Sequence, residues 1–433
     1  MKVAYYSLGC KVNLYESQSV INQFLDAGFE LVNFNDVSDV YIINTCSITH
    51  VSDAKSRKII REAIKRNSNA IIAVMGCYSQ LRPQDIKDIN GVDVVVGTTN
   101  RSKLFEIVMS KINNKNNVLD DSFYTDVLKA KEYEELKLNK YNNKTRGFVK
   151  VQEGCDNYCS YCTVPYARGH IRSRKIENCV DEITRLTNLG MKEIILSGIN
   201  TGAYGKDFGK TLSDLLKEIF KIPNLGRIRI SSIEESEITK DLLDVIKENE
   251  EHFCMHFHIP LQGACNNTLK RMNRKYNTEE YKKKIDLIRS YFKDVNITTD
   301  ILAGFSGETE EDFNDSLKFI ASIKYGEMHV FPYSRRPLTK AYDFKDVVDE
   351  ITKRKRVNEL LSLNNMLALE YRNQFKNKIV EVLVEKNVNS KCFGHSSNYL
   401  EVEFIDDTAK ENDIILVEII EINYPICKGR RIK

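Results

Sequence analysis

The feature that most constrains this chain is a group of three cysteines in one short loop, VQEGCDNYCSYCTVPYARGHIRSR, at residues 151–174. Cys155, Cys159 and Cys162 follow the pattern C-x₃-C-x₂-C, and no fourth cysteine stands nearby. Four thiolates saturate an iron–sulfur cluster, so three would leave one iron of a four-iron cluster open to a substrate. The alternative is a zinc knuckle completed by His170, although zinc sites usually contain paired C-x₂-C arms. The spacing therefore favours a cluster with an open position.

Composition places this loop in a globular protein of several domains. Of the 433 residues, 42% are hydrophobic and 29% are charged, a mixture typical of packed domains. The start, MKVAYYSLGC, does not resemble a signal peptide, and no run of about 18 apolar residues occurs. We therefore expect a cytoplasmic protein without a membrane span. In that compartment eleven cysteines, an odd number, are better explained as metal ligands or buried residues than as disulfides.

Residues 1–112 alternate short apolar runs with helical patterns. The runs are KVAYYSL, VYIIN, AIIAVM and VDVVVG. Apolar residues at helical spacing around Phe24 separate the first two runs, and Gly28 closes that helix. Strands that alternate with helices predict a parallel sheet of the Rossmann or flavodoxin-like kind. The polar residues 113–146 are interpreted as a linker with room for one short helix.

Two further domains are predicted after the linker. Residues 147–375 repeat a strand followed by a helix six times, which predicts a full or partial (β/α) barrel with its chemistry at the carboxyl ends of the strands. A long helix ends this block, with apolar residues from Leu360 to Phe375 at helical spacing. Residues 376–433 contain the β-rich runs IVEVLVE, YLEVEFI and IILVEIIEI, which predict a small β-barrel of the oligonucleotide-binding kind. The predicted fold class is α/β with this barrel at its end.

A second set of cysteines stands in the first block, in SLGCKVN, INTCSIT and VMGCYSQ. Cys10, Cys46 and Cys77 each follow directly after an apolar run that is predicted to be a parallel strand. Because neighbouring strand ends share one edge of such a sheet, the three thiols are expected to converge there. The alternative is three buried cysteines that act as small apolar residues.

The three cysteines of the loop resemble the signature of the radical S-adenosylmethionine superfamily, and the aromatic residue before the last of them, Tyr161, fits that signature too. We call these three the radical triad, and Cys10, Cys46 and Cys77 the auxiliary triad. The resemblance implies a [4Fe–4S] cluster whose open iron binds the amino and carboxylate groups of S-adenosylmethionine. It further implies that one-electron reduction cleaves the cofactor and releases a 5′-deoxyadenosyl radical.

A longer series of motifs resembles the methylthiotransferases within that superfamily. In order they are SLGCKVNLYES, NTCSITHVSDAKSR, GCYSQ, the radical signature, LSGINTGAYGKD, RISSIE, PLQ, MNRKY, DILAGF-GET and FPYSRRP. The resemblance implies a second [4Fe–4S] cluster on the auxiliary triad and a C-terminal RNA-binding TRAM domain. It also implies tRNA as a partner and a reductant such as flavodoxin or ferredoxin. The implied domains are 1–112, 113–146 as linker, 147–375 and 376–433.

The sequence after the first cysteine distinguishes three branches of that family. GCKVN-x-YES and DAKSR resemble the branch that adds a methylthio group to carbon 2 of N6-threonylcarbamoyladenosine, beside the anticodon at position 37. The other branches act on isopentenyladenosine in tRNA or on an aspartate of a ribosomal protein. From a different class, a non-catalytic iron–sulfur electron carrier or an RNA-binding zinc protein would also use the cysteines.

Several residues are candidates for cofactor and substrate contacts. Residues after successive predicted strands could hold S-adenosylmethionine, although ordinary loop capping is the alternative; with Tyr161 they are Gly198, Asn200, Ser232, Glu234 and Gln262. Basic residues close behind the radical triad could reach RNA phosphates; they are Arg168, Arg172 and Arg174. The net charge of +3 allows only local basic patches, of which the best is the tail, with Lys428, Arg430, Arg431 and Lys433.

The threonylcarbamoyl group carries a carboxylate, so its pocket should offer a cation, for which Arg335 or Arg336 in FPYSRRP is the candidate. Three motifs depart from the family pattern: FSGET has Ser306 in place of proline, RRPLT has Leu338 in place of glycine, and PLQGACNN replaces PLQSGSD. The remaining cysteines are predicted to be ordinary core or surface residues, with Cys265 the exception to watch. The roles of His170, His256, His258 and His329 stay open.

Overall fold

The computed structural model describes residues 1–113, 126–136, 138 and 145–432. Contacts divide the chain into two compact units. The first unit comprises Met1–Asn142, Gln152–Arg174 and Ser334–Tyr342. The second comprises Asn143–Val151, Lys175–Tyr333 and Asp343–Lys433. The loop with the radical triad therefore groups with the N-terminal block, whereas a domain boundary at residue 147 assigns it to the following one.

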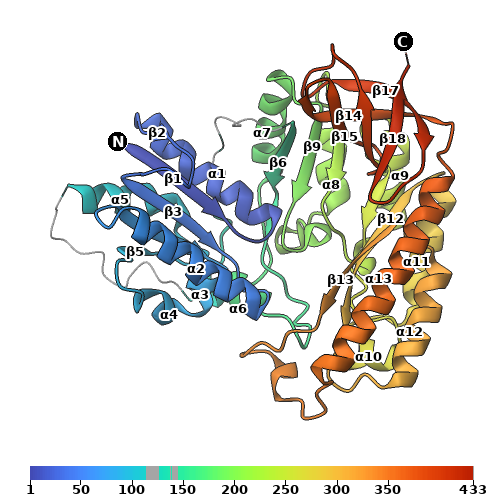
Figure 1. Cartoon of the computed structure of the whole chain (residues 1–433), viewed down its shortest axis with the longest axis horizontal. Helices are drawn as coiled ribbons and strands as arrows, with labels where there is room; N and C mark the ends of the chain where they lie inside the picture. The colour runs from blue at the N-terminus through green and yellow to red at the C-terminus, as the bar shows by residue number, and fades with distance from the viewer. Residues whose placement is uncertain (114–125, 137, 139–144, 433) are drawn as a thin grey trace. The chain divides into compact units, whose positions relative to one another are not determined.

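The core of the first unit is a five-stranded parallel sheet (Figure 1). In spatial order its strands are β2 (Glu30–Leu31), β1 (Lys2–Ser7), β3 (Val40–Thr45), β4 (Ile71–Gly76) and β5 (Val94–Val95). The central strand β3 is buried along its whole length, as expected for a parallel strand covered on both faces. The predicted parallel sheet is confirmed.

Helices cover both faces of this sheet. Apolar residues of α1 (Lys11–Asp26) and α5 (Leu104–Ile112) pack on one face, and those of α2 (His50–Arg66) pack on the other. Around them lie the shorter elements α3 (Cys77–Leu81), α4 (Pro83–Lys87) and the 3₁₀ helix η1 (Arg101–Lys103).

The predicted linker falls partly outside the described residues. Its described part includes a 3₁₀ helix, η3 (Val127–Lys129), and is packed rather than extended. Leu136 and Leu138 are buried against Tyr15, and the Tyr15 hydroxyl donates a hydrogen bond of 2.7 Å to the Leu136 carbonyl. This stretch belongs to the first unit, whereas its polar composition predicts a linker.

The second unit contains a partial (β/α) barrel of six parallel strands. The strands form two sheets, β10-β9-β6 and β11-β12-β13, which a parallel bridge between Ile228 and Phe253 connects. The strands are β6 (Arg146–Lys150), β9 (Glu193–Ser197), β10 (Arg227–Ile230), β11 (His256–His258), β12 (Asn296–Ala303) and β13 (Glu327–Pro332). All six lie where the sequence predicts strands.

The helices of this barrel also follow the predicted order (Figure 1). They are α7 (Ile176–Asn188), α8 (Leu212–Ile219), α9 (Lys240–Glu248), α11 (Thr278–Tyr291), α12 (Glu310–Ile323) and the long α13 (Glu350–Asn373). Capping boxes begin three of them, at Thr211, Asn277 and Thr309, because each cap and its third residue exchange hydrogen bonds. One helix that the sequence analysis does not predict, α10 (Asn266–Arg271), lies in the PLQGACNN segment. The short 3₁₀ helices are η4 (Thr201–Ala203), η5 (Lys206–Phe208), η6 (Glu235–Glu237), η7 (Glu250–His252) and η8 (Lys340–Asp343).

The last sixty residues form a closed five-stranded barrel, as predicted. Its strands close in the order β14 (Ile379–Val388), β15 (Lys391–Ser396), β16 (Glu401–Ile405), β18 (Ile426–Arg431) and β17 (Ile414–Glu421). Three of these strands are predicted from the sequence, whereas β15 and β18 are not.

This small barrel is joined to the central one by partly buried hydrogen bonds within the second unit. Arg227 donates to the His395 carbonyl over 3.0 Å, and Arg229 donates to the Ser397 carbonyl over 3.1 Å. Both guanidinium groups also bind the Glu193 carboxylate, at 2.7 and 2.8 Å. The turn between β15 and β16 therefore lies against the central strands. Among the described residues, no helix is both long and apolar enough to cross a lipid bilayer.

Candidate functional site

The loop that carries the radical triad is closed at its base by two short antiparallel strands, β7 (Gln152–Glu153) and β8 (Arg172–Ser173). Inside this base, Gly154 has a φ of +74°, and a Cβ atom there would lie 1.9 Å from the His170 carbonyl oxygen. Only glycine fits at such a close approach. The Cys155 amide then donates to the Gly169 carbonyl over 3.0 Å. The loop is thus anchored immediately before its first cysteine.

Backbone groups fix the rest of this loop. The Cys162 amide donates to the Cys159 carbonyl over 3.0 Å, and the Val164 amide, at the start of α6 (Val164–Arg168), donates to the Cys162 sulfur over 3.4 Å. All three cysteines of the radical triad are half-buried. The half-buried Tyr161 lies between the last two of them in sequence. Donors to the cysteine sulfur suit a thiolate ligand.

The structure brings the auxiliary triad together at one edge of the N-terminal sheet. Cys10 follows β1, Cys46 follows β3 and Cys77 follows β4, and these three strands are neighbours. The sulfur of Cys46 would lie 3.0 Å from a Cβ atom added at Gly9. Burial raises the pKa of the Cys77 thiol to about 12; the Arg168 charge opposes this, whereas the other two thiols add to it. The three sulfurs are therefore close enough to influence one another.

Neither triad is arranged for a single zinc ion. Two sulfurs that bind the same zinc at about 2.3 Å cannot lie more than about 4.6 Å apart. Across the described ranges, only one group of three potential ligand atoms lies within 4.8 Å of one another, and it contains no cysteine. His170, the candidate fourth zinc ligand, pairs instead with Asp156 through Nδ1 at 2.6 Å. A four-iron cluster fits better, because each sulfur then binds a different iron.

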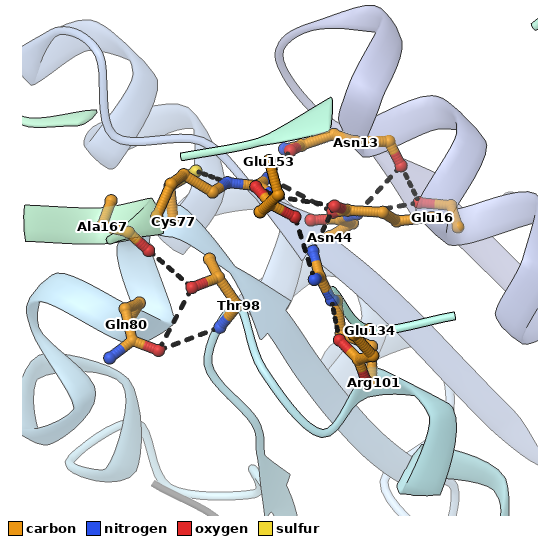
Figure 2. A network of polar contacts seen from close by, with 12 residues as sticks. Asn13, Glu16, Asn44, Cys77, Gln80, Thr98, Arg101, Glu134, Glu153 and Ala167 are labelled. Carbon is orange, nitrogen blue, oxygen red and sulfur yellow. Dashed lines mark hydrogen bonds and ion pairs between the residues drawn. The ribbon is translucent and has the colours of Figure 1, made fainter. Parts of the chain in front are cut away.

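A buried polar network adjoins the auxiliary triad (Figure 2). Its centre is Arg168, the last residue of α6, which is 0% exposed. Its Nε donates to the Cys77 sulfur over 3.3 Å, and its Nη1 donates to Glu16 and Glu153 at 2.6 and 3.0 Å. Arg101 binds the same two carboxylates and also Glu134. A buried guanidinium on a cysteine sulfur fits a negatively charged thiolate–iron cluster.

The prediction that Arg168, Arg172 and Arg174 contact RNA phosphates is not supported by these positions. All three side chains are buried. Arg172 donates to the Arg168 carbonyl over 2.6 Å, and Arg174 binds the Glu135 carboxylate. Guanidinium groups that are already paired inside the protein are not exposed to a polyanion, and for Arg168 the structure indicates the network at Cys77 instead.

Arg335 and Arg336 lie in the segment Ser334–Tyr342 of the first unit. Arg335 stacks on the Tyr342 ring at 5.1 Å and donates to the Tyr342 carbonyl. Arg336 is buried, and its Nη2 donates to the Asp53 carboxylate at 2.6 Å and to the Ser47 hydroxyl at 2.9 Å. Ser47 directly follows a cysteine of the auxiliary triad. The same segment also reaches the radical loop, because the Ala341 amide donates to the Ser160 carbonyl over 2.7 Å.

The cofactor candidates of the second unit follow adjacent strands of the central barrel at their carboxyl ends. Gly198 and Asn200 follow β9, Ser232 and Glu234 follow β10, and Gln262 follows β11. A parallel sheet brings such residues to one edge.

Two of these candidates have internal roles as well. Glu234 forms an ion pair with Arg274 of the MNRKY motif, and Gln262, with a φ of +67°, bridges to Ile301 on the neighbouring strand. Arg274 is a partner that the sequence analysis misses.

The basic tail is part of strand β18. Lys428, Arg430 and Arg431 each pair with a carboxylate of the same small barrel, those of Glu421, Glu418 and Asp406 respectively. Lys428 and Arg430 remain more than half exposed. Lys433 lies outside the described residues.

Cys265 has a structural position. It is buried, its sulfur accepts the Thr268 amide at 3.4 Å at the start of α10, and it donates to Asp312 over 3.5 Å. Other cysteines that are predicted to be ordinary are also buried: Cys179, Cys254, Cys392 and Cys427.

A polar row that the sequence analysis does not predict crosses β11, β12 and β13. The Asp300 carboxylate lies 3.4 Å from His258 Nε2 and 3.1 Å from His329 Nδ1. Burial opposes ionisation of Asp300, but its hydrogen bonds to the two imidazoles hold its pKa well below the usual range. His256 joins the same row through Thr298, at 2.8 Å. The sequence signal for this row is the alternation of His256 and His258 along β11, and that alternation does not indicate Asp300.

Comparisons with known proteins agree with this geometry. Residues 149–320 match the radical SAM superfamily, and residues 2–97 match the uncharacterized protein family UPF0004. The threonylcarbamoyladenosine tRNA methylthiotransferase MtaB of Bacillus subtilis is 38% identical over 100% of this chain and 96% of its own length. A tRNA-2-methylthio-N(6)-dimethylallyladenosine synthase of Thermoanaerobacter pseudethanolicus is 33% identical over 97% of this chain and 91% of its own length.

A solved structure supports the fold alone. The radical S-adenosylmethionine methyltransferase TsrM of Kitasatospora setae superimposes with a TM-score of 0.59 at 14% identity, covering 79% of this chain and 77% of that one. The superfamily implies S-adenosylmethionine and a [4Fe–4S] cluster, to which the radical triad is suited. Because the Bacillus subtilis relative is 38% identical over 100% of this chain, the chain belongs to the radical S-adenosylmethionine tRNA methylthiotransferases.

Proposed function

We propose that the enzyme adds a methylthio group to carbon 2 of N6-threonylcarbamoyladenosine at position 37 of tRNA. The relative from Bacillus subtilis that carries this substrate in its name is 38% identical, against 33% for the dimethylallyladenosine relative. GCKVN and DAKSR favour the same branch. A methylthiotransferase for isopentenyladenosine or for a ribosomal-protein aspartate is the alternative.

The observation that carries this proposal is that the buried guanidinium of Arg336 has donors without an acceptor. The Nη2 atom binds Asp53 and Ser47, but within the described parts of the chain the buried Nε and Nη1 atoms have no hydrogen-bond partner. Buried donors are normally satisfied, so these two nitrogens suit a ligand that offers them acceptors. A carboxylate is such an acceptor, and its hydrogen bonds to a guanidinium are charge-assisted. The threonylcarbamoyl group has a carboxylate, whereas the isopentenyl group is wholly apolar.

Both triads are proposed to hold [4Fe–4S] clusters, one on Cys155, Cys159 and Cys162 and one on Cys10, Cys46 and Cys77. When bound, the first cluster supplies reductive cleavage of S-adenosylmethionine, and the second holds the sulfur that is transferred. In the radical loop a backbone donor, the Val164 amide, binds the Cys162 sulfur, and the auxiliary triad is held at three neighbouring strand ends. The residues proposed to contact the cofactor are, in the second unit, Gly198, Asn200, Ser232, Glu234 and Gln262, and, in the first unit, Tyr161.

We further propose that the C-terminal barrel is a TRAM domain, residues 376–433, which contacts tRNA through Lys428, Arg430 and Arg431. An adenosine in the single-stranded anticodon loop can be unstacked and presented to a pocket. A flavodoxin or ferredoxin would supply the electron.

Mass spectrometry of tRNA nucleosides tests the substrate. A strain that lacks this gene should lose the methylthio group on threonylcarbamoyladenosine alone, and re-expression should restore it. Loss on isopentenyladenosine, with threonylcarbamoyladenosine still methylthiolated, would assign the enzyme to the other tRNA branch.

A further inference from the structure

The short helix α6 connects the two cysteine triads through the chain itself. It begins two residues after Cys162 and ends at Arg168, whose side chain reaches the Cys77 sulfur. Within the same unit, the Thr98 hydroxyl donates to the Ala167 carbonyl and anchors this helix beyond the end of β5. The position of Arg168 is therefore tied both to the radical loop and to the N-terminal sheet.

Every donor of the Arg168 guanidinium has an acceptor. Its Nη1 and Nη2 atoms together bind both oxygens of Glu16, one oxygen of Glu153 and the amide oxygen of Asn13. The remaining N–H, on Nε, is directed to the Cys77 sulfur at 3.3 Å. Because the planar group is held on two edges, its third edge has little freedom to turn away from the sulfur.

Asn13 extends these hydrogen bonds to the strand ends that carry the other two cysteines of the auxiliary triad. Its amide nitrogen donates to the carbonyl of Leu8, two residues before Cys10, at 2.7 Å, and to the carbonyl of Thr45, directly before Cys46, at 3.1 Å. Its amide oxygen, which accepts from Arg168, lies 3.9 Å from the Cys10 sulfur. Both side chains are at most 1% exposed. Together, Asn13 and Arg168 contact all three strand ends that carry the auxiliary triad.

We propose that Arg168 is a positioning residue for the auxiliary iron–sulfur cluster: its Nε–H holds the Cys77 thiolate in the ligand orientation and raises the reduction potential of the cluster. The inference rests on the proposed function, since it requires that cluster to be present. A hydrogen bond to a ligand sulfur stabilises the more negative, reduced state, and such bonds are among the features that set cluster potentials. A purely structural ion-pair network would not need the sulfur contact.

The first test detects the hydrogen bond directly, in a parent variant that keeps Arg168. The full-length variant with Cys155, Cys159 and Cys162 changed to Ala, labelled with ¹⁵N-arginine and reconstituted anaerobically, isolates the auxiliary cluster. After reduction with dithionite, pulsed electron paramagnetic resonance should show a weak ¹⁵N coupling from the hydrogen-bonded guanidinium. The coupling should vanish when Arg168→Lys is added. Absence of the coupling in the parent would overturn the proposal.

The second test is potentiometric, in the same parent. Arg168→Lys keeps a positive charge beside Glu16 and Glu153 but removes the fixed Nε–H, so the midpoint potential should become more negative at unchanged iron content. Arg101→Lys is the matched control, because Arg101 binds both of these carboxylates and, among the described residues, donates no hydrogen bond to a sulfur. Its potential should stay at the parent value.

Two outcomes of this measurement distinguish a failure of the Arg168 role from a failure of the proposed function. Equal shifts in both variants would assign the effect to network charge and refute the hydrogen-bond role of Arg168. A parent that binds no iron would instead contradict the auxiliary cluster of the proposed function.

Discussion

The guanidinium of Arg336 donates a hydrogen bond of 2.6 Å to the carboxylate of Asp53, which lies 283 positions earlier in the chain. This contact holds the segment Ser334–Tyr342 against the start of α2 within the first unit. It neutralises the arginine charge but leaves the buried Nε and Nη1 donors for a ligand. Recognition of a substrate carboxylate by such donors depends on geometry more than on net charge.

We predict that Arg336→Lys impairs modification of threonylcarbamoyladenosine tRNA. Lysine can still pair with Asp53, so the melting temperature should change little, but it lacks the Nε and Nη1 donors. Removal of a charge-assisted hydrogen bond should cost about 1–3 kcal/mol of transition-state stabilisation, which lowers kcat/KM about 5- to 150-fold. The measurement is single-turnover kinetics with purified tRNA. Arg335→Lys, whose parent side chain stacks on Tyr342, is the control; an equal loss in both variants would contradict a specific role for Arg336.

Iron content should report the two triads separately. Anaerobic reconstitution should give about eight irons per chain, that is, four per cluster. Changing the radical triad to Ala should halve the iron and abolish formation of 5′-deoxyadenosine. Changing the auxiliary triad should also halve the iron but leave some cofactor cleavage. If the second variant kept all its iron, no cluster would reside at Cys10, Cys46 and Cys77.

The salt dependence of tRNA affinity should respond to the tail in both directions. Neutralising Lys428, Arg430 and Arg431 with Gln should flatten the plot of log affinity against log salt, by about 0.7–0.9 for each phosphate that the tail no longer neutralises. The double variant Glu418→Gln, Glu421→Gln should steepen it, because it removes the carboxylates that now pair with Arg430 and Lys428. Filter binding at several salt concentrations measures both slopes. Unchanged slopes in both variants would place the RNA-binding surface elsewhere.

Replacing Leu338 by glycine should stabilise the protein. Leu338 is 60% exposed and has a φ of +72°, a left-handed conformation that costs a non-glycine residue about 1–2 kcal/mol. The greater freedom of glycine in the unfolded chain offsets about 0.4–1 kcal/mol of the gain. Urea unfolding should therefore show a net increase of roughly 0.5–1 kcal/mol. Leu338→Ala, which keeps the strained backbone, should show no such gain; a gain equal to that of glycine would refute the strain.

Stability should fall in acid because of Glu193. Burial opposes ionisation of its carboxyl, but Arg229, Arg227 and Arg146 hold its pKa well below the ordinary value of 4.5. A depressed folded-state pKa stabilises the protein above the unfolded-state value, and this contribution is lost as the pH falls below it. Removing one partner of a buried pair costs about 3–5 kcal/mol at neutral pH, so Glu193→Gln should melt lower at pH 7. Thermal melts between pH 7 and pH 3.5 should show that difference narrowing; a constant difference would exclude this titration.

Much of the fold follows from local patterns in the sequence. The run VYIIN predicts a fully buried strand because no polar residue interrupts its core, and the neighbouring helices are delimited by residues such as Gly28. The pattern C-x₃-C-x₂-C identifies the radical triad by itself, and the matched positions of the auxiliary triad after three strands predict its convergence. These signals arise within a few residues.

What the sequence conceals depends on distant partners. Arg168 resembles a phosphate ligand in the sequence because a basic residue behind a catalytic loop is usually exposed. Its partner Glu16 lies 152 positions away, and no local pattern indicates that pairing. Likewise, KGRR has the composition of a charged tail, since strand β18 is recognisable only from its pairing with β16 and β17. Asp300 escapes prediction for the same reason, because its histidines lie on neighbouring strands.

The contacts of Arg227 and Arg229 with the turn after β15 have a consequence for how the molecule is made. The amino ends of the central strands meet backbone carbonyls that the ribosome adds only near the end of synthesis, since those carbonyls belong to His395 and Ser397. Domains generally fold from the N-terminus as the chain emerges. The first unit's sheet can assemble early, but the base of the central barrel stays unfinished until almost the whole chain has been translated. A nascent chain released early would keep the ion pairs of both arginines with Glu193 but lack the carbonyl acceptors that cover their outer side.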